Sequence, residues 1–154
     1  MKKIIAGAAL ALAATAANAE FGVGITQNTY SNSGIKNELG FKATAGSSLY
    51  GFGTYEEPEV NGYDVELIGV GAGAKAGLSD SFALFVEGGY YFADEEKGAP
   101  YGLKDDFGGR VGVSVAPMEH IEFTGGYKFL SLDVKDSNLS NKFNGFELGV
   151  NFVF

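Results

Sequence analysis

Large apolar residues occupy every second position through most of the chain after residue 20. In the clearest run, 82–92, Phe82, Leu84 and Val86 share one parity, while Phe85 and Glu87 share the other. Side chains of a β-strand point alternately to its two faces, so this alternation predicts strands, and helical spacing is hard to find. We expect eight strands, at 21–26, 35–45, 50–53, 63–76, 82–92, 107–115, 121–129 and 146–154.

The predicted connections alternate in length. Short ones lie around 46–48, 77–81 and 116–119, and longer ones at 27–34, 56–62, 93–106 and 133–142. An even number of strands with short and long connections at opposite ends is typical of an antiparallel up-and-down meander that closes into a barrel.

Two strands have a less regular pattern. In 63–76 the bulky parity changes between Leu67 and Ile68, which indicates either a bulge or an upper half that projects beyond the buried band. The third strand is expected to place Tyr50 and Phe52 on its bulky face, but it is short, so its register can slip by one residue.

The two faces of the predicted sheet differ in composition. One is bulky and apolar, and the other consists largely of glycine, of which the chain has 24, with a few charges. A water-facing surface would use more polar side chains, whereas the interior of an eight-stranded barrel has room only for small residues and paired charges. The sequence therefore predicts an all-β, closed eight-stranded transmembrane barrel with lipid outside. The predicted interior charges are Glu38, Lys42, Lys75, Glu87, Arg110, Glu122, Lys128 and Glu147.

The N-terminus has the pattern of a secretory signal peptide. Lys2 and Lys3 precede an uncharged run, and Ala17 and Ala19 flank Asn18. This Ala-x-Ala pattern predicts cleavage between Ala19 and Glu20, which leaves 20–154 as one exported barrel domain.

The chain resembles the OmpA-like family of small outer-membrane β-barrels, which includes the OmpX and Ail/Lom types. The resemblance lies in the leader, in "GLSDSFALFVEGGYYF" and in the final "GFELGVNFVF". It implies a Gram-negative outer membrane, contact with its lipid and lipopolysaccharide, and insertion by the barrel assembly machinery. It also implies an assembly signal on the last strand, formed by Phe146, Leu148, Val150, Phe152 and Phe154.

Charge and cysteine content exclude other classes of partner. The chain has 11 basic and 19 acidic residues, a net charge of −8, which argues against nucleic acid. It has no cysteine, so neither a disulfide framework nor a thiolate metal site is expected.

We expect no enzyme, no cofactor and no metal. The glycine-rich stretch from Gly69 to Gly77 is followed by another strand, whereas a phosphate loop precedes a helix. The single histidine, His120, is predicted in a short periplasmic turn with no nucleophile on its face, at the wrong end for lipid A chemistry.

The remaining interpretation is a monomeric barrel with a structural or surface-interaction role in envelope integrity, adhesion or phage and host contact. The acidic connections 56–62 and 93–106 are either a solvated rim or a surface for a cationic or divalent-bridged partner. The interior charges favour a salt-bridged plug over a narrow porin-like channel. A soluble periplasmic lipocalin-like carrier, with its apolar face inward, is a further alternative.

Overall fold

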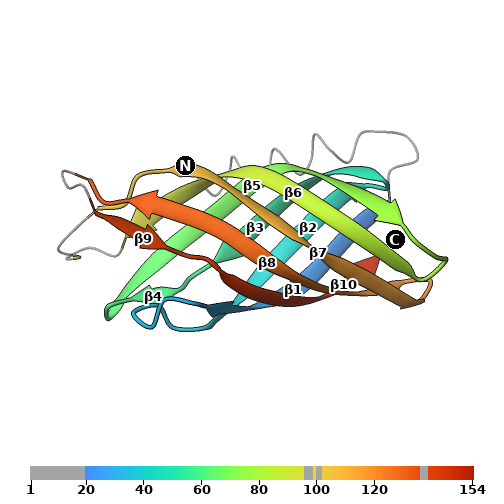
Figure 1. The fold of residues 1–154 in the computed structure, drawn as a ribbon, viewed down its shortest axis with the longest axis horizontal. Helices are drawn as coiled ribbons and strands as arrows, with labels where there is room; N and C mark the ends of the chain where they lie inside the picture. The colour runs from blue at the N-terminus through green and yellow to red at the C-terminus, as the bar shows by residue number, and fades with distance from the viewer. Residues whose placement is uncertain (1–19, 96–98, 100–101, 136–138) are drawn as a thin grey trace.

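Eight long antiparallel strands form a closed barrel, as the sequence predicts (Figure 1). The computed structural model describes residues 20–95, 99, 102–135 and 139–154, so the predicted leader 1–19 lies outside the described residues. No helix in this part of the chain is long and apolar enough to cross a membrane. The wall strands are β1 (Phe21–Tyr30), β2 (Glu38–Gly46), β3 (Leu49–Glu56), β5 (Tyr63–Gly77), β6 (Phe82–Glu95), β7 (Asp106–Met118), β8 (Ile121–Asp133) and β10 (Gly145–Val153).

The barrel closes between its first and last strands. β1 pairs with β10 from Gly22 opposite Val153 to Tyr30 opposite Gly145. At the end of this seam, the N–H of Phe21 donates to the carbonyl of Phe154 at 3.1 Å, and the N–H of Phe154 donates back at 2.8 Å. Closure gives the backbone groups of both terminal strands partners within the protein, which a lipid environment requires.

The two ends of the barrel differ. Residues 47–48, 78–81 and 119–120 form tight connections at the end that also holds Phe21 and Phe154; we call it the short-turn end. The opposite, long-loop end carries β4 (Glu59–Val60), which pairs with β5, and β9 (Ser140–Lys142), which pairs with β8. β4 and β9 lie together at one end of the barrel in Figure 1, far from the C-terminus.

A two-residue turn joins β4 to β5. Its central residues, Asn61 and Gly62, have φ values of 52° and 91°. Positive φ at both positions is the requirement of the type I′ hairpin turn, and Asn-Gly is the preferred pair for it. The turn folds Val60 back against Tyr63, and Ile35 bridges to Val60 from the other side.

The predicted orientation is confirmed for most of the wall. On β6, for example, Leu84 and Val86 point outward while Phe85, Glu87 and Tyr91 are buried inside. Large apolar side chains are exposed on the outer wall along β1, β2, β6, β7, β8 and β10. Its exposed large side chains include Val23, Ile25, Leu39, Phe41, Leu84, Val86, Phe107, Val111, Val113, Val115, Phe123, Phe129, Phe146, Leu148, Val150 and Phe152.

The orientation of β3 differs from the prediction. Its large residues, Tyr50 and Phe52, were expected on the lipid face, but they lie inside and are 8% and 6% exposed. The register explains this, because Phe52 pairs with the inward Thr44 of β2. Glycines provide the space: a Cβ added at Gly71 or Gly89 would lie within 3 Å of the Phe52 ring.

No bulge interrupts β5. Its pairing with β6 runs without a shift from Val65 opposite Glu95 to Gly77 opposite Ala83. Val65 and Leu67 are therefore inward residues, because the interior itself becomes apolar near the long-loop end. Ile35, expected on the apolar face of the second strand, precedes β2 and is buried at the same end.

Candidate functional site in the barrel interior

The centre of the interior holds a neutral cluster of four charges around Glu87. The carboxylate of Glu87 accepts a hydrogen bond from Lys42 Nζ and another from Arg110 Nε at 2.9 Å. Tyr50 Oη also donates to it at 2.7 Å. Arg110 contacts Glu147 as well, so two cations face two anions. All four charged side chains are buried, and pairing offsets the cost of removing them from water.

Two inward phenylalanines complete this central cluster. Lys42 Nζ lies 5.2 Å from the ring centroid of Phe52, and the Arg110 guanidinium lies 4.6 Å from that of Phe85. Cations are attracted to the negative face of an aromatic ring, more strongly when water is excluded. The rings therefore pack the interior and also contact its positive charges favourably.

A second ion pair lies closer to the long-loop end. Lys128 Nζ is 2.7 Å from both carboxylate oxygens of Glu56, and both residues are 2% exposed. Tyr30 Oη donates to Glu56 Oε2 at 2.7 Å. The Tyr91 ring centroid lies 5.1 Å from Lys128 Nζ. This lysine thus has a carboxylate and an aromatic face as its partners.

The short-turn end is more open and polar. Lys75 pairs there with Glu122 at 2.5 Å, and both side chains are partly exposed. A hollow of about 360 Å³ opens beside them, lined by Ser79, Ser81 and Ser114 among others. A smaller pocket of about 40 Å³ continues past this pair to Glu87.

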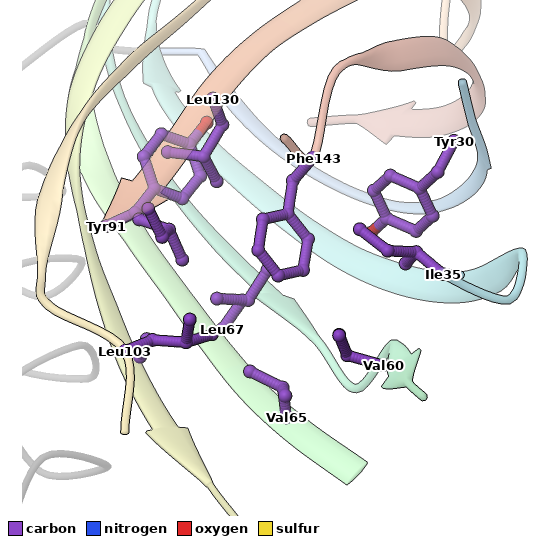
Figure 2. Packing of buried hydrophobic residues seen from close by; sticks show 11 residues of the cluster. Tyr30, Ile35, Val60, Val65, Leu67, Tyr91, Leu103, Leu130 and Phe143 are labelled. Atoms are coloured by element: carbon purple, nitrogen blue, oxygen red, sulfur yellow. The ribbon is translucent and has the colours of Figure 1, made fainter. Parts of the chain in front are cut away.

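Apolar side chains close the interior at the long-loop end. Ile35, Val60, Leu103 and Phe143 come from the four long connections and meet side chains of the wall strands. Leu103 and Phe143 are completely buried, and Phe143 packs edge-on against the ring of Tyr30. Figure 2 shows this group, which we call the apolar plug. Its members are Tyr30, Ile35, Val60, Val65, Leu67, Tyr91, Ala93, Leu103, Leu130, Leu132 and Phe143.

The structure brings most of the predicted interior charges together. Lys42, Glu87, Arg110 and Glu147 form the central cluster, Lys75 pairs with Glu122, and Lys128 pairs with Glu56. Glu38 is different: it is half-buried near the long-loop end, and the ion pairs among the described residues do not include it.

Glu56 is an interior residue that sequence reasoning missed. It was placed in the acidic connection 56–62, yet it is the last residue of β3 and faces Lys128. Two signals point to it. It follows the inward Tyr50, Phe52 and Thr54 at steps of two, and Lys128 requires a buried anion.

Several acidic groups of the long connections make contacts within the chain. Glu59 pairs with Lys36 at 2.7 Å, and Asp105 accepts from the N–H of Ala93 at 2.9 Å. Glu95 accepts a hydrogen bond from the N–H of Leu103, which orients that plug residue. These carboxylates hold the loops in place. Glu96 and Lys97 of the predicted acidic rim lie outside the described residues.

His120 lies where the sequence places it, in the turn between β7 and β8 at the short-turn end. Its Nδ1 is 3.0 Å from the carbonyl oxygen of Val153. Among the described residues, no group of three or more His, Asp or Glu side chains is placed to hold a metal ion. Gly69 to Gly77 belong to β5, and rings of the neighbouring strands fill the space at Gly69, Gly71 and Gly73.

A closed eight-stranded barrel with an apolar outside and an ion-paired inside has the fold of the small outer-membrane barrels. Residues 11–145 match the family described as "Protein of unknown function, DUF481", and the chain belongs to that family. No curated protein matches the chain.

Solved structures with similar folds share little sequence with this chain. The N-terminal β-barrel domain of Pseudomonas aeruginosa OprF has a TM-score of 0.65 and 12% identity, over 88% of this chain and 97% of that one. A de novo designed transmembrane β-barrel has a TM-score of 0.66 and 12% identity, over 88% of this chain and 95% of that one. Ail of Yersinia pestis has a TM-score of 0.55 and 14% identity, over 88% of this chain and 97% of that one. The predicted resemblance is thus confirmed for the fold.

Proposed function

We propose that this chain is an integral outer-membrane protein whose sealed barrel has a structural or surface-interaction role without catalysis. The carrying observation is the distribution of polarity, with apolar side chains outside and paired charges inside. In hydrocarbon an exposed charge is costly, whereas an apolar wall and a closed backbone network are tolerated. A lipocalin-like carrier would need the opposite arrangement, with its apolar surface around an internal ligand.

Aromatic side chains support a membrane position. On the outer wall, the ring of Tyr90 packs edge-on against Phe92 and Phe107, and the ring of Tyr127 contacts Phe129 and Phe146. Such clusters are typical of the aromatic girdles where lipid meets water. In the proposed orientation, the long loops face the outside with its lipopolysaccharide, and the short turns face the periplasm.

The interior supports a sealed barrel over a channel. A polar hollow enters from the short-turn end, which is the feature that favours a narrow pore. Beyond it stand the Glu87 cluster, the Lys128–Glu56 pair and the apolar plug. A solute would have to separate both ion-pair layers and then cross a dry hydrophobic layer.

Export and assembly belong to the same proposal. A leader ending at Ala19 would deliver the chain to the periplasm, and mass spectrometry of the membrane form should then begin at Glu20. The outward residues of β10, from Phe146 to Phe152, together with Phe154 directly after the strand, would carry the signal for the barrel assembly machinery. Deleting Phe154 should lower the outer-membrane yield, while an unchanged yield would remove that role.

Electrophoresis after membrane fractionation tests the proposal. The protein should require detergent for extraction and should migrate differently in SDS before and after boiling. In planar bilayers, the detergent-extracted protein should give no steady conductance. Recovery in the aqueous periplasmic fraction would refute the membrane assignment, and a steady conductance would replace the sealed barrel with a channel.

A further inference from the structure

The outer wall carries a hollow at the seam between β1 and β10. It is a shallow, open hollow with a volume of about 830 Å³. It lies on the outside, so it is separate from the polar space of the interior. Four strands contribute to it: β2, β1, β10 and β8.

The shape of the hollow follows from side-chain size along one row. Ile25 of β1 is paired with Phe41 on one side and with Val150 on the other, and Val150 is paired with Phe123. Two β-branched residues therefore form the floor, between phenylalanines on the flanking strands. The floor continues along β1 from Val23 to Gln27, about 14 Å at ~3.4 Å per residue.

The lining is almost entirely apolar. Its polar side chains are those of Gln27 and Thr124, and Thr124 is buried toward the interior. The Gln27 amide donates to the carbonyls of Asn28 at 3.3 Å and Glu38 at 3.2 Å, so it is tied to the backbone. The hollow therefore fits a ligand that is long, narrow and without polar groups along its length.

We propose that this seam groove holds one acyl chain of a membrane lipid in a persistent position. The inference rests on the proposed outer-membrane location, because the groove is continuous with the lipid-facing wall. In a bilayer, apolar surfaces gain no hydrophobic energy from each other, so preference depends on shape and packing. A shallow groove between phenylalanines offers a chain more contact area than a convex wall does. A symmetric second copy would place hollow against hollow and leave a gap.

Native mass spectrometry tests this site. The full chain is folded into vesicles of palmitoyl-oleoyl phosphatidylethanolamine, transferred to mild detergent and weighed intact. Wild type should retain one phospholipid per barrel, and Val150→Phe, which fills the floor, should lose it. Val111→Phe is the matched control, because Val111 is an outward valine on β7, away from the seam, and it should retain the lipid.

The outcomes separate the site from the membrane assignment. Heat-dependent mobility in SDS shows whether each variant is folded, and Ile25→Phe fills the same floor from β1 if Val150→Phe does not fold. A folded wild type without retained lipid would overturn the seam site alone. The seam site would also be overturned if both floor variants retained the lipid. It would be overturned as well if the wild type were a dimer that the floor variants disrupt. A chain that is soluble without detergent would instead overturn the proposed function.

Discussion

Lys128 is a charged side chain with almost no contact with solvent, and its neighbours account for it. Glu56 supplies the opposite charge, and Tyr30 supplies a hydrogen bond that stabilises the carboxylate. Desolvation of two ions costs several kcal/mol each, so such a pair contributes little net stability compared with two apolar residues. Removing one member is different, because the other remains charged and buried.

We therefore expect Lys128→Met to lower the free energy of unfolding by about 3–5 kcal/mol. The uncompensated carboxylate of Glu56 is the cause, since the methionine still fills the space. Urea unfolding in lipid vesicles, followed by electrophoretic mobility, measures the change. The double variant Lys128→Met with Glu56→Met should recover most of the loss; a double variant as unstable as the single one would contradict this explanation.

Glycines of the wall have two distinct roles that substitution can separate. A Cβ at Gly71, on the inner face of β5, would lie 2.2 Å from the carbonyl oxygen of Gly88 and 2.8 Å from the Phe52 ring. A Cβ at Gly88 itself would have no atom within 4 Å. The first glycine permits close packing, and the second leaves open space on the outer face.

Gly71→Ala should destabilise the barrel by about 1–3 kcal/mol through overpacking. Gly88→Ala should be neutral or stabilise it by up to about 1 kcal/mol, because alanine restricts the unfolded chain more than glycine does. The stability changes of both variants are measured from their unfolding midpoints in the same lipid vesicles. Equal effects at the two positions would show that the inner face is not tightly packed.

At the scale of strands, alternation predicted orientation well wherever one parity carried a charge. The predicted orientations of β6 and β10 are correct because Glu87 and Glu147 mark their inner faces. The predicted orientation of β3 is wrong because Tyr50 and Phe52 lie on its inner face, so apolar side chains do not by themselves mark the lipid side. Near the long-loop end both faces of the wall are apolar, so hydropathy does not distinguish them there.

Depth along a strand should set the effect of a charge on the outer wall. Val111 lies near the middle of β7, whereas Met118 is its last residue at the short-turn end. Val111→Lys should cost about 2–4 kcal/mol and Met118→Lys about 0–1 kcal/mol, because lysine near the interface reaches water. Unfolding in vesicles compares the two variants, and similar costs at both depths would argue against a spanning orientation.

For the whole molecule, the charges of the interior were largely predictable and the apolar plug was not. An isolated charge in a glycine-rich strand is a strong local signal, as at Arg110 and Lys128. The plug instead combines Ile35, Leu103 and Phe143 from three separate connections, and Leu103 reaches its place by bridging to Val134. Such contacts depend on the closed barrel, so no short window of sequence contains them.

The plug should be the last barrier to solute. Replacing Phe143 by alanine removes a completely buried ring, with an expected cost of about 3–5 kcal/mol. Because the ring seals one end of the interior, brief conductance events in planar bilayers should be more frequent than in wild type. Leu139→Ala, at an exposed side chain of the same connection, is the control and should leave the recordings unchanged.

Loops join each wall strand to the next, except that β10 and β1 are held together only by hydrogen bonds, which at the short-turn end include those between Phe21 and Phe154. A short linker from Phe154 to Glu20 would supply the missing covalent connection. New chain ends could then be made between Ser47 and Ser48, in a tight turn at the same end of the barrel. Such a circular permutant keeps every strand pair but makes β2 the final strand. Folding in vesicles would then depend on the unchanged pairing, while insertion in cells would report whether β10 must come last. The position of the missing connection therefore makes it possible to study folding and cellular assembly separately.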